Sequence, residues 1–146
     1  MTPWYNKYIG LPFKHLGQDA STGIDCFNLC AYVLKQECGF PVGMFTSDFC
    51  NIVDDDWYLK VTESLLDIGA NTNRPDFRWK RVTTPAPYDV LIMSIGSTNV
   101  ANHCALYVDD DKLLQTMIGR TSWVSPYGKY YKQYTLGIYR WNGLKN

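Results

Sequence analysis

The clearest hydrophobic pattern in the chain lies between Asp25 and Gly39. Apolar side chains recur there every three or four positions, which places them on one face of an α-helix: Cys26, Leu29, Cys30, Val33 and Leu34. Asp25 is a residue type that favours the N-cap, and Gly39 is typical of the position just after a helix. The sequence therefore predicts a helix over about Cys26–Cys38, with Cys26 at the N-terminal end of the apolar face.

The C-terminal half of the chain carries strand patterns instead. Phe77–Val82 alternates like a half-exposed strand, and Tyr88–Ile95 has the continuous apolar character of a buried strand. His103–Val108 and Leu113–Met117 flank an acidic turn and predict a hairpin, and Tyr134–Trp141 predicts a closing strand. Helices followed by an antiparallel sheet predict an α+β fold, in which the N-terminal helix packs on the sheet.

The remaining segments have less regular patterns. Gly10–Gly23 is rich in turn residues, and Asp55–Gly69 predicts a second helix that ends at a glycine. The chain has 146 residues, which is enough to bury a hydrophobic core without disulfides or a metal. We predict a single domain over residues 1–146, with a helical or loop insertion at about residues 50–85.

Composition and charge exclude several classes of protein. With 46% hydrophobic and 15% aromatic residues, the chain is expected to be packed rather than disordered. Fourteen basic and fourteen acidic residues give a formal net charge of zero, so no field of one sign favours nucleic acid or an anionic membrane. No apolar run is long enough to cross a bilayer. We therefore expect neither nucleic acid nor membrane insertion.

The N-terminus and the cysteines indicate where the protein is made. "MTPWYNKYIG" lacks the basic start and apolar stretch of a signal peptide, so we predict synthesis in the cytoplasm. The five cysteines are an odd and irregularly spaced set. They favour free thiols in a reducing compartment over a disulfide framework.

Cys26 is the first candidate for chemistry. The first turn of a helix has unpaired N–H groups and the positive end of the helix dipole, and both favour the reactive thiolate form of a cysteine. The same N–H groups can stabilise the oxyanion of a tetrahedral intermediate, a contribution of about 3 kcal/mol. Free cysteine is also among the most buried residue types. The helix alone thus leaves two interpretations open, a nucleophile or a core residue.

His103 and Gln115 could complete such a site. The chain has two histidines, and a cysteine nucleophile needs one nearby as a base. If the hairpin loop is Asp109–Asp111, Ala105 pairs with Gln115, and His103 lies diagonally from Gln115 on the same face. The amide oxygen can then accept one imidazole N–H and leave the other nitrogen to face the thiol. A loop one residue longer would move Gln115 to the opposite face.

Metal binding is the alternative use of the same atoms. The candidate ligands are Cys26, Cys30, Cys38, His103 and Cys104. However, Cys-x3-Cys within a helix is not the spacing of a zinc knuckle, and His103 and Cys104 point to opposite faces of a strand. We therefore expect no metal and no other cofactor, and we interpret Cys30 and Cys104 as core residues.

The order of Cys26, His103 and Gln115 along the chain resembles that of the NlpC/P60 family of cysteine peptidases. "YIGLPFKHLGQDASTGIDCFNLCAYVLKQECGFPV" resembles the nucleophile segment of that family. "PAPYDVLIM" resembles its Pro-x-x-Gly-Asp-Val strand, and "HCALYVDDDKLLQT" resembles its histidine hairpin. The resemblance implies a papain-like core, in which a cysteine at a helix N-terminus faces a histidine on an antiparallel sheet. Gln115 would then occupy the third catalytic position.

The resemblance also implies a substrate and a setting. It suggests a cysteine peptidase of peptidoglycan stem peptides that cuts the bond following D-glutamate, with Phe13, Asp25 and Phe27 in contact with the substrate. The Asp-Cys-aromatic form and the "YIGLPF" opening look most like the peptidases of phage tail tips and gene transfer agents. This implies a virion component, made in the host cytoplasm, whose partners are tail hub or tip proteins.

Several positions depart from the family pattern. The usual Cys-Ser-Gly is Cys26-Phe27-Asn28, the glycine before the central-strand aspartate is Tyr88, and the tyrosine of the substrate loop is Phe13. These departures motivate a second hypothesis, a structural or interaction module of the tail tip with little or no activity. A third hypothesis is an acyltransferase or amidase that uses the same cysteine and histidine.

Overall fold

The computed structural model describes residues 2–15, 17–40, 79–96 and 102–143. In chain order, its elements are η1 (Trp4–Tyr8), β1 (Gln18–Asp19), β2 (Gly23–Ile24), α1 (Cys26–Cys38), β3 (Trp79–Val82), β4 (Val90–Met93), β5 (His103–Tyr107), β6 (Lys112–Gln115), β7 (Trp123–Pro126), α4 (Lys129–Tyr134) and β8 (Thr135–Trp141). The helix predicted over Asp55–Gly69, and most of the predicted insertion at about residues 50–85, lie outside the described residues.

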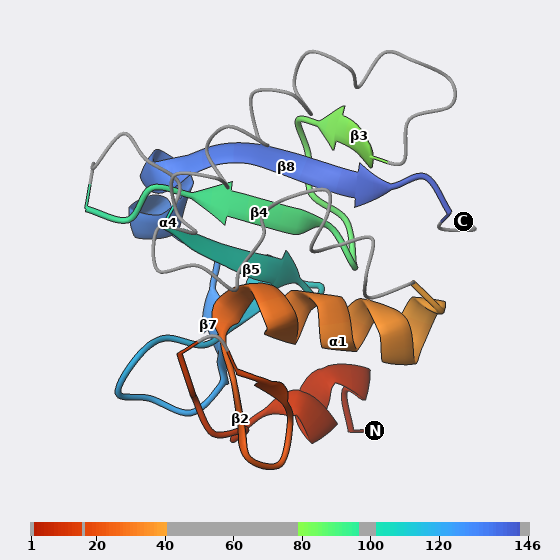
Figure 1. The fold of residues 1–146 in the computed structure, drawn as a ribbon. Coiled ribbons are helices and arrows are strands. Elements are labelled where there is room, and N and C mark those ends of the chain that lie inside the picture. The colour runs from red at the N-terminus through yellow and green to blue at the C-terminus, as the bar shows by residue number, and fades with distance from the viewer. Residues whose placement is uncertain (1, 16, 41–78, 97–101, 144–146) are drawn as a thin grey trace.

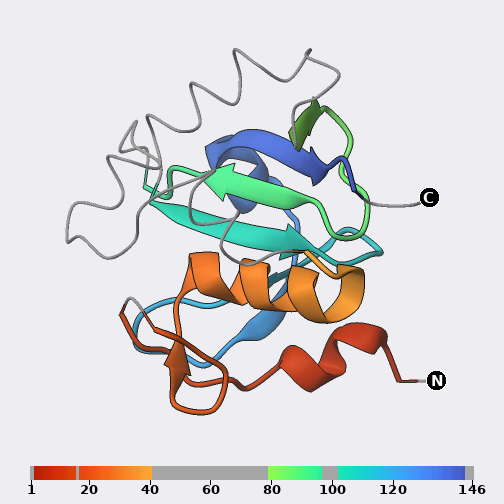
Figure 2. The same cartoon turned by 45° about the vertical axis from the view of Figure 1, so that its right-hand side comes forward.

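A six-stranded antiparallel sheet forms the centre of the fold, with the strand order β3-β8-β4-β5-β6-β7. Helix α1 packs against one face of this sheet, next to β5, and η1 lies on the far side of α1 (Figures 1 and 2). A separate two-stranded ribbon, β1-β2, immediately precedes α1. The predicted α+β architecture, with an N-terminal helix on an antiparallel sheet, is confirmed.

The predicted strands are present, although β6 begins one residue earlier and ends two residues earlier than predicted, and residues 77–78 of the first one lie outside the described residues. The sequence missed β7. This strand pairs with β6 at the edge of the sheet and ends at Pro126. Proline is tolerated at sheet edges because it has no N–H for a central ladder, so it obscures the strand pattern there. The short helix α4 also precedes β8, and β8 accordingly begins at Thr135 rather than Tyr134.

Helix α1 begins and ends where its sequence predicts. The Asp25 carboxylate accepts a hydrogen bond from the Asn28 N–H at 2.8 Å, and Gly39 adopts a left-handed conformation with φ of 74°. The apolar face of the helix is buried against the sheet. On its other side, Tyr8 of η1 contacts Tyr32 ring to edge and donates a hydrogen bond to Glu37. The helix is therefore held on two sides.

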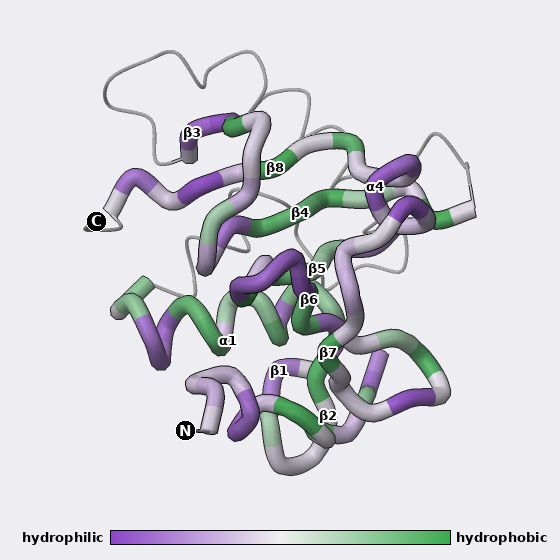
Figure 3. The backbone as a smooth tube through the Cα atoms, turned by 180° about the vertical axis from the view of Figure 1, so that it is seen from behind, coloured by the Kyte–Doolittle hydropathy of each residue, from purple (hydrophilic) through white to green (hydrophobic). Residues whose placement is uncertain are grey.

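The sheet carries apolar side chains on both faces. The residues on the helix side include Val90, Ile92, Cys104, Leu106 and Leu114. The opposite face forms a second cluster made of Leu91, Met93, Ala105, Tyr107, Leu113, Tyr127 and Ile138. Figure 3 shows β4 as hydrophobic along its length, whereas α1 alternates between hydrophobic and hydrophilic residues. Among the described residues, no helix has the length and apolar character needed to cross a membrane.

The β5–β6 hairpin has the predicted register. Leu106 pairs with Leu114 and Tyr107 with Leu113, and the Val108 N–H donates to the Lys112 carbonyl at 3.1 Å. The loop therefore consists of three residues, Asp109–Asp111. Asp110 and Asp111 adopt left-handed φ values of 47° and 59°, a conformation that aspartate tolerates better than most residues.

A buried ion pair anchors the start of β4. The Asp89 carboxylate is fully buried and accepts two hydrogen bonds from Arg140 of β8, from Nε at 2.9 Å and from Nη2 at 2.8 Å. Tyr88, one residue earlier, has a φ of 75°, in the left-handed region that favours glycine. This is the position at which the resemblance expects glycine, so the backbone keeps the glycine-like turn although the residue has changed.

Candidate active site

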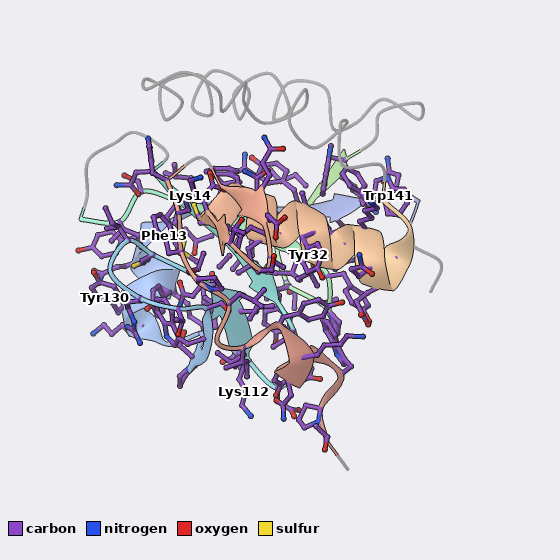
Figure 4. All side chains as sticks on the ribbon, turned by 60° about the horizontal axis from the view of Figure 1, so that its bottom comes forward. Phe13, Lys14, Tyr32, Lys112, Tyr130 and Trp141 are labelled. Carbon is purple, nitrogen blue, oxygen red and sulfur yellow. The ribbon has the colours of Figure 1, made fainter. Side chains whose placement is uncertain are left out.

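A cavity of about 350 Å³ lies where α1 begins. Cys26, the first residue of α1, and His103, the first residue of β5, both line it. Asp25 and Asn102 add polar groups, and Phe13, Ile95, Met117 and Ile118 add apolar ones. Figure 4 shows Phe13 near the N-terminal end of α1 and Trp141 near the opposite end of the helix. The cavity thus gathers side chains from the loop before α1 and from the ends of β4, β5 and β6.

Cys26 has the environment of an activated thiol. It is 7% exposed, and the Cys104 Sγ lies 3.4 Å from its carbonyl oxygen. A hydrogen bond from the Cys104 thiol lowers the pKa of the Cys26 thiol well below its ordinary value. Burial acts in the opposite direction, and the hydrogen bond and charge of His103 lower this pKa further. The surroundings therefore favour the thiolate, which is the nucleophilic form of cysteine.

His103 is held by the residue that the hairpin register places beside it. Its Nε2 lies 2.8 Å from the Oε1 atom of Gln115, and both side chains are buried. The imidazole and the Cys26 thiol line the same cavity, and the imidazole lowers the pKa of that thiol. Because Gln115 occupies Nε2, the nitrogen left for Cys26 is Nδ1. The structure therefore brings together all three residues that the sequence proposed as catalytic.

The Gln115 side chain has a second partner on the edge strand. Its Nε2 donates a hydrogen bond to the Ser125 Oγ at 2.7 Å. Gln115 pairs with Trp123 across β6 and β7, and Leu113 pairs with Ser125, so Gln115 and Ser125 are diagonal neighbours on one face of the sheet. A line of polar side chains thus crosses β5, β6 and β7, from His103 through Gln115 to Ser125.

Asp25 contributes both to the helix and to the cavity. Its carboxylate caps α1, and the side chain is 8% exposed. Burial, and next the nearby Cys26 thiolate, raise the pKa of Asp25 to about 7, although the N–H groups of Asn28 and Phe27 act in the opposite direction. Near neutral pH, Asp25 is therefore divided between its charged and neutral forms.

The other described thiols, Cys30, Cys38 and Cys104, do not line the cavity. Cys30 and Cys104 are fully buried, and their sulfur atoms lie 3.4 Å apart. Burial, followed by the charge of Glu37, raises the pKa of Cys38 to about 11. Within the described parts of the chain, no three His, Cys, Asp or Glu side chains converge as they would around a metal ion. The close sulfur atoms are thus arranged as a packed thiol pair in the core.

One residue expected to contact the substrate lies elsewhere. The Phe27 side chain is 1% exposed, belongs to the helix-side core and does not line the cavity. It follows Cys26 in the first turn of α1, where the helix turns this side chain into the protein interior. Phe13 and Asp25 do line the cavity, as a substrate contact requires.

Sequence patterns did not reveal three polar residues of this region. The Asn102 side chain hydrogen-bonds both the N–H and the carbonyl of Ile95, at 2.8 and 2.9 Å, and so joins the ends of β4 and β5. Thr116 lines the cavity, and its buried hydroxyl has no hydrogen-bond partner among the described residues. Ser125 lies on the strand that the sequence missed, so no pattern could have placed it beside Gln115.

The sequence profile of the NlpC/P60 family matches residues 10–140. The chain belongs to the NlpC/P60 family. The match includes every residue of the Cys26, His103 and Gln115 constellation, as well as Phe13, Asp25 and Ser125. The predicted papain-like core of this family is therefore confirmed.

Solved structures agree with this NlpC/P60 assignment at the level of the fold. The chain is 19% identical to the NlpC/p60 domain of peptidoglycan hydrolase SagA, with a TM-score of 0.53, and the match covers 90% of this chain and 88% of that domain. It is 16% identical to an NlpC/P60 family protein of Bacillus cereus, with a TM-score of 0.53, covering 92% of this chain and 36% of the other.

A third similar structure is an NLP/P60 family protein of Staphylococcus aureus described as similar to lipoprotein. The identity is 16%, the TM-score 0.54, and the match covers 96% of this chain and 39% of that protein. The chain therefore spans well under half of the Bacillus and Staphylococcus proteins, but nearly all of the SagA domain. No curated protein sequence matches the chain.

Proposed function

We propose that this NlpC/P60 domain is a cysteine peptidase that hydrolyses the stem peptides of peptidoglycan, at the bond that follows D-glutamate. The observation that carries the proposal is that Cys26 and His103 line one cavity, with His103 held by Gln115. A nucleophile, its base and the group that orients the base are the arrangement that covalent catalysis by cysteine requires.

In the first half of the reaction, the Cys26 thiolate attacks the carbonyl carbon of the scissile amide and forms a carbon–sulfur bond. The carbonyl oxygen becomes an oxyanion, which the Cys26 backbone N–H stabilises because N–H groups in the first helical turn have no carbonyl partner within the helix. His103, protonated in the ion pair, gives its Nδ1 proton to the leaving amine as the carbon–nitrogen bond breaks. The product of this half is a thioester on Cys26.

In the second half, water hydrolyses the thioester. His103 is now neutral and accepts a proton from the attacking water at Nδ1. The carbon–sulfur bond breaks, the new carboxylate leaves, and the thiolate–imidazolium pair is restored. Gln115 accepts the Nε2–H through both halves, which keeps Nδ1 directed at the reacting atoms.

The shape and chemistry of the cavity suit part of a peptide. Its volume of about 350 Å³ falls in the range of small-molecule sites. Asp25 offers hydrogen-bond acceptors to a substrate amine or amide, whereas Phe13, Ile95 and Met117 offer an apolar surface. A stem peptide, which has amides, charged groups and short aliphatic side chains, can use both kinds of contact.

The direct test is to incubate the purified protein with defined muropeptides and to identify the products by mass spectrometry. We expect wild type to release fragments with a new D-glutamyl carboxylate, and Cys26→Ala to release none. Cys30→Ala is a matched control, because it removes a nearby thiol that is buried and does not line the cavity. Intact muropeptides with wild type, or equal cleavage by Cys26→Ala, would contradict the proposal.

The same products separate hydrolysis from acyl transfer. If the thioester is transferred to an added amine instead of water, the product is an amide. Its mass exceeds that of the hydrolysed fragment by the mass of the amine minus the mass of one water molecule. We expect only the hydrolysed product, even with a millimolar amine present. A dominant transfer product would instead assign the chain to the acyltransferase hypothesis.

We further propose that the peptidase acts as a component of a phage tail tip. The support is the form of the nucleophile segment, with its "YIGLPF" opening and Asp25-Cys26-Phe27 sequence. Virions purified from cells that carry the gene should contain the chain, and antibodies against it should label the tail tip in electron micrographs. Finding the chain in the lysate while it is missing from purified particles would contradict this location.

A further inference from the structure

The polar line that starts at His103 does not end at Gln115. Gln115 is fully buried, so both ends of its amide group must find partners within the protein. Its Oε1 faces His103 at 2.8 Å and its Nε2 faces the Ser125 Oγ at 2.7 Å. Ser125 lies on the edge strand β7 and does not line the cavity.

The orientation of this amide matters to the base. A protonated imidazole has an N–H on both nitrogens, so the group facing Nε2 must be an acceptor. If the Gln115 amide turned over, its NH2 group would face the imidazolium N–H, and two donors would meet at hydrogen-bond distance. With the neutral imidazole, the turned amide would favour a proton on Nδ1, the nitrogen that must receive the proton of the attacking water.

We propose that Ser125 is a positioning residue of the active site: its hydroxyl accepts a hydrogen bond from the Gln115 amide and so anchors this buried side chain where its oxygen meets His103. Ser125 touches neither substrate nor the reacting atoms, and acts through Gln115. The kinetic consequences rest on the proposed peptidase function, whereas the protonation of His103 can be measured without any substrate.

Other titratable groups also face His103, and they must be accounted for. Asp25, Cys26 and His15 line the same cavity, and Cys104 follows His103 in β5. Asp25 and Cys104 lie outside the strand that carries Ser125, and their hydrogen bonds go to Asn28, Cys30 and the Cys26 carbonyl. A change at Ser125 therefore reaches His103 through Gln115.

Nuclear magnetic resonance of the imidazole nitrogens tests the inference directly. The chain has two histidines, so a 15N-labelled protein gives two ring spin systems, and His15→Gln assigns the remaining one to His103. With Ser125→Ala, we expect the titration midpoint of His103 to fall by about one pH unit, because the imidazolium loses a reliable acceptor at Nε2. The neutral ring should also show more of the Nδ1–H tautomer.

The pH dependence of activity should shift in the same direction as the titration of His103. For Ser125→Ala, the alkaline limb of the kcat/KM profile should move down by the same interval, so kcat/KM should fall about tenfold at pH values above the wild-type limb. KM should change little, because Ser125 does not line the cavity. Ser125→Thr keeps a hydroxyl at this position and should restore both the limb and the titration of His103.

Val124→Ala provides a structural control on the same strand. Val124 packs against the helix-side core, so its truncation should lower the unfolding midpoint without moving the titration of His103. A wild-type titration and tautomer in Ser125→Ala, or an equal shift in Val124→Ala, would overturn the inference. A protein that leaves muropeptides intact but shows the expected shift in Ser125→Ala would overturn the peptidase function and leave this positioning role standing.

Discussion

The Nε2 atom of His103 and the Oε1 atom of Gln115 lie 2.8 Å apart, across a hairpin whose loop has three residues. This relationship depends on the hairpin register, since a shift of one residue would move Gln115 to the other face of the sheet. Gln115 is uncharged, so it orients the imidazolium of His103 with less electrostatic stabilisation than a carboxylate would supply.

Gln115 should therefore influence both the rate and its pH dependence. We expect Gln115→Ala to lower kcat by about 30-fold, because His103 loses its orienting partner. Gln115→Glu places a carboxylate beside the imidazolium and favours its protonated form, so the alkaline limb of the pH–rate profile should move to higher pH. Lys112→Ala, on the same strand, is the control. Profiles that coincide for wild type, Gln115→Ala and Gln115→Glu would exclude a role for Gln115 in holding the base.

The thiols should differ sharply in reactivity. The pKa of Cys26 is lowered, chiefly by the Cys104 hydrogen bond, whereas that of Cys38 is raised to about 11 by burial. Cys30 and Cys104 are fully buried. We expect one equivalent of iodoacetamide at pH 6.5 to label Cys26 first, as peptide mass spectrometry would show, because the thiolate is the form that reacts.

Two variants make the alkylation experiment specific. Cys50 lies outside the described residues, so the labelling is done in a Cys50→Ser background. His103→Ala should slow the labelling of Cys26 at pH 6.5, because the imidazolium no longer stabilises the thiolate. Faster labelling of Cys38 than of Cys26 would contradict the expected activation.

Asp25 should give the protein an unusual dependence of stability on pH. Burial and then the Cys26 thiolate raise its pKa from 3.8 to about 7, so between these pH values the folded protein retains a proton that the unfolded chain releases. The free energy of unfolding must then fall as pH rises through this interval. Asp25→Asn keeps a good N-cap residue and removes this loss. We expect the variant to exceed wild type by on the order of 3 kcal/mol at pH 8.

Urea unfolding from pH 4 to pH 8, followed by tryptophan fluorescence, measures this difference. At pH 4 the two proteins should have nearly equal stability, because Asp25 is then protonated in the folded state. Asp19→Asn is the control of opposite sign, with the titration extended to pH 2. Hydrogen bonds from Ser21, then from Thr22, lower the pKa of Asp19 below 3.8, so its stabilising effect is lost as pH falls below that value. A constant difference between Asp25→Asn and wild type across this range would contradict the raised pKa.

At Tyr88, glycine should give a more stable protein than alanine, which is the reverse of the usual order. Its φ is 75°, a conformation that costs other residues about 1 kcal/mol more than glycine. Tyr88→Ala and Tyr88→Gly both lose the ring contact with Trp4, whose centroid lies 4.8 Å away, so their difference isolates the backbone. We expect Tyr88→Gly to be more stable than Tyr88→Ala by about 1 kcal/mol in thermal or urea unfolding.

The helix offers a matched comparison for Tyr88. At Lys35, an exposed position within α1, glycine should be less stable than alanine by about 1 kcal/mol. The preference should thus reverse between the two positions. The same order at both would show that the left-handed backbone at Tyr88 has no energetic consequence.

The sequence by itself determined the local elements of the site. The Asp25 cap, the apolar spacing and Gly39 specified α1, and the run of three aspartates marked the hairpin turn. These features depend on hydrogen bonds and backbone conformations within a few residues, so periodicity and turn chemistry are sufficient to predict them. The sequence related His103 to Gln115 only on the condition of a three-residue loop, and the structure supplied that loop length.

Only the tertiary structure decided what surrounds those residues. The position of Ser125 beside Gln115 depends on β7 joining the sheet edge next to β6, and the Cys104 contact with Cys26 depends on how α1 packs against β5. Phe27 was expected in the cavity, but the packing of the first helical turn buries it in the core. The raised pKa of Asp25 likewise comes from burial. Contacts between distant segments and the loss of water around a group have no local pattern, because they arise only when the whole domain packs.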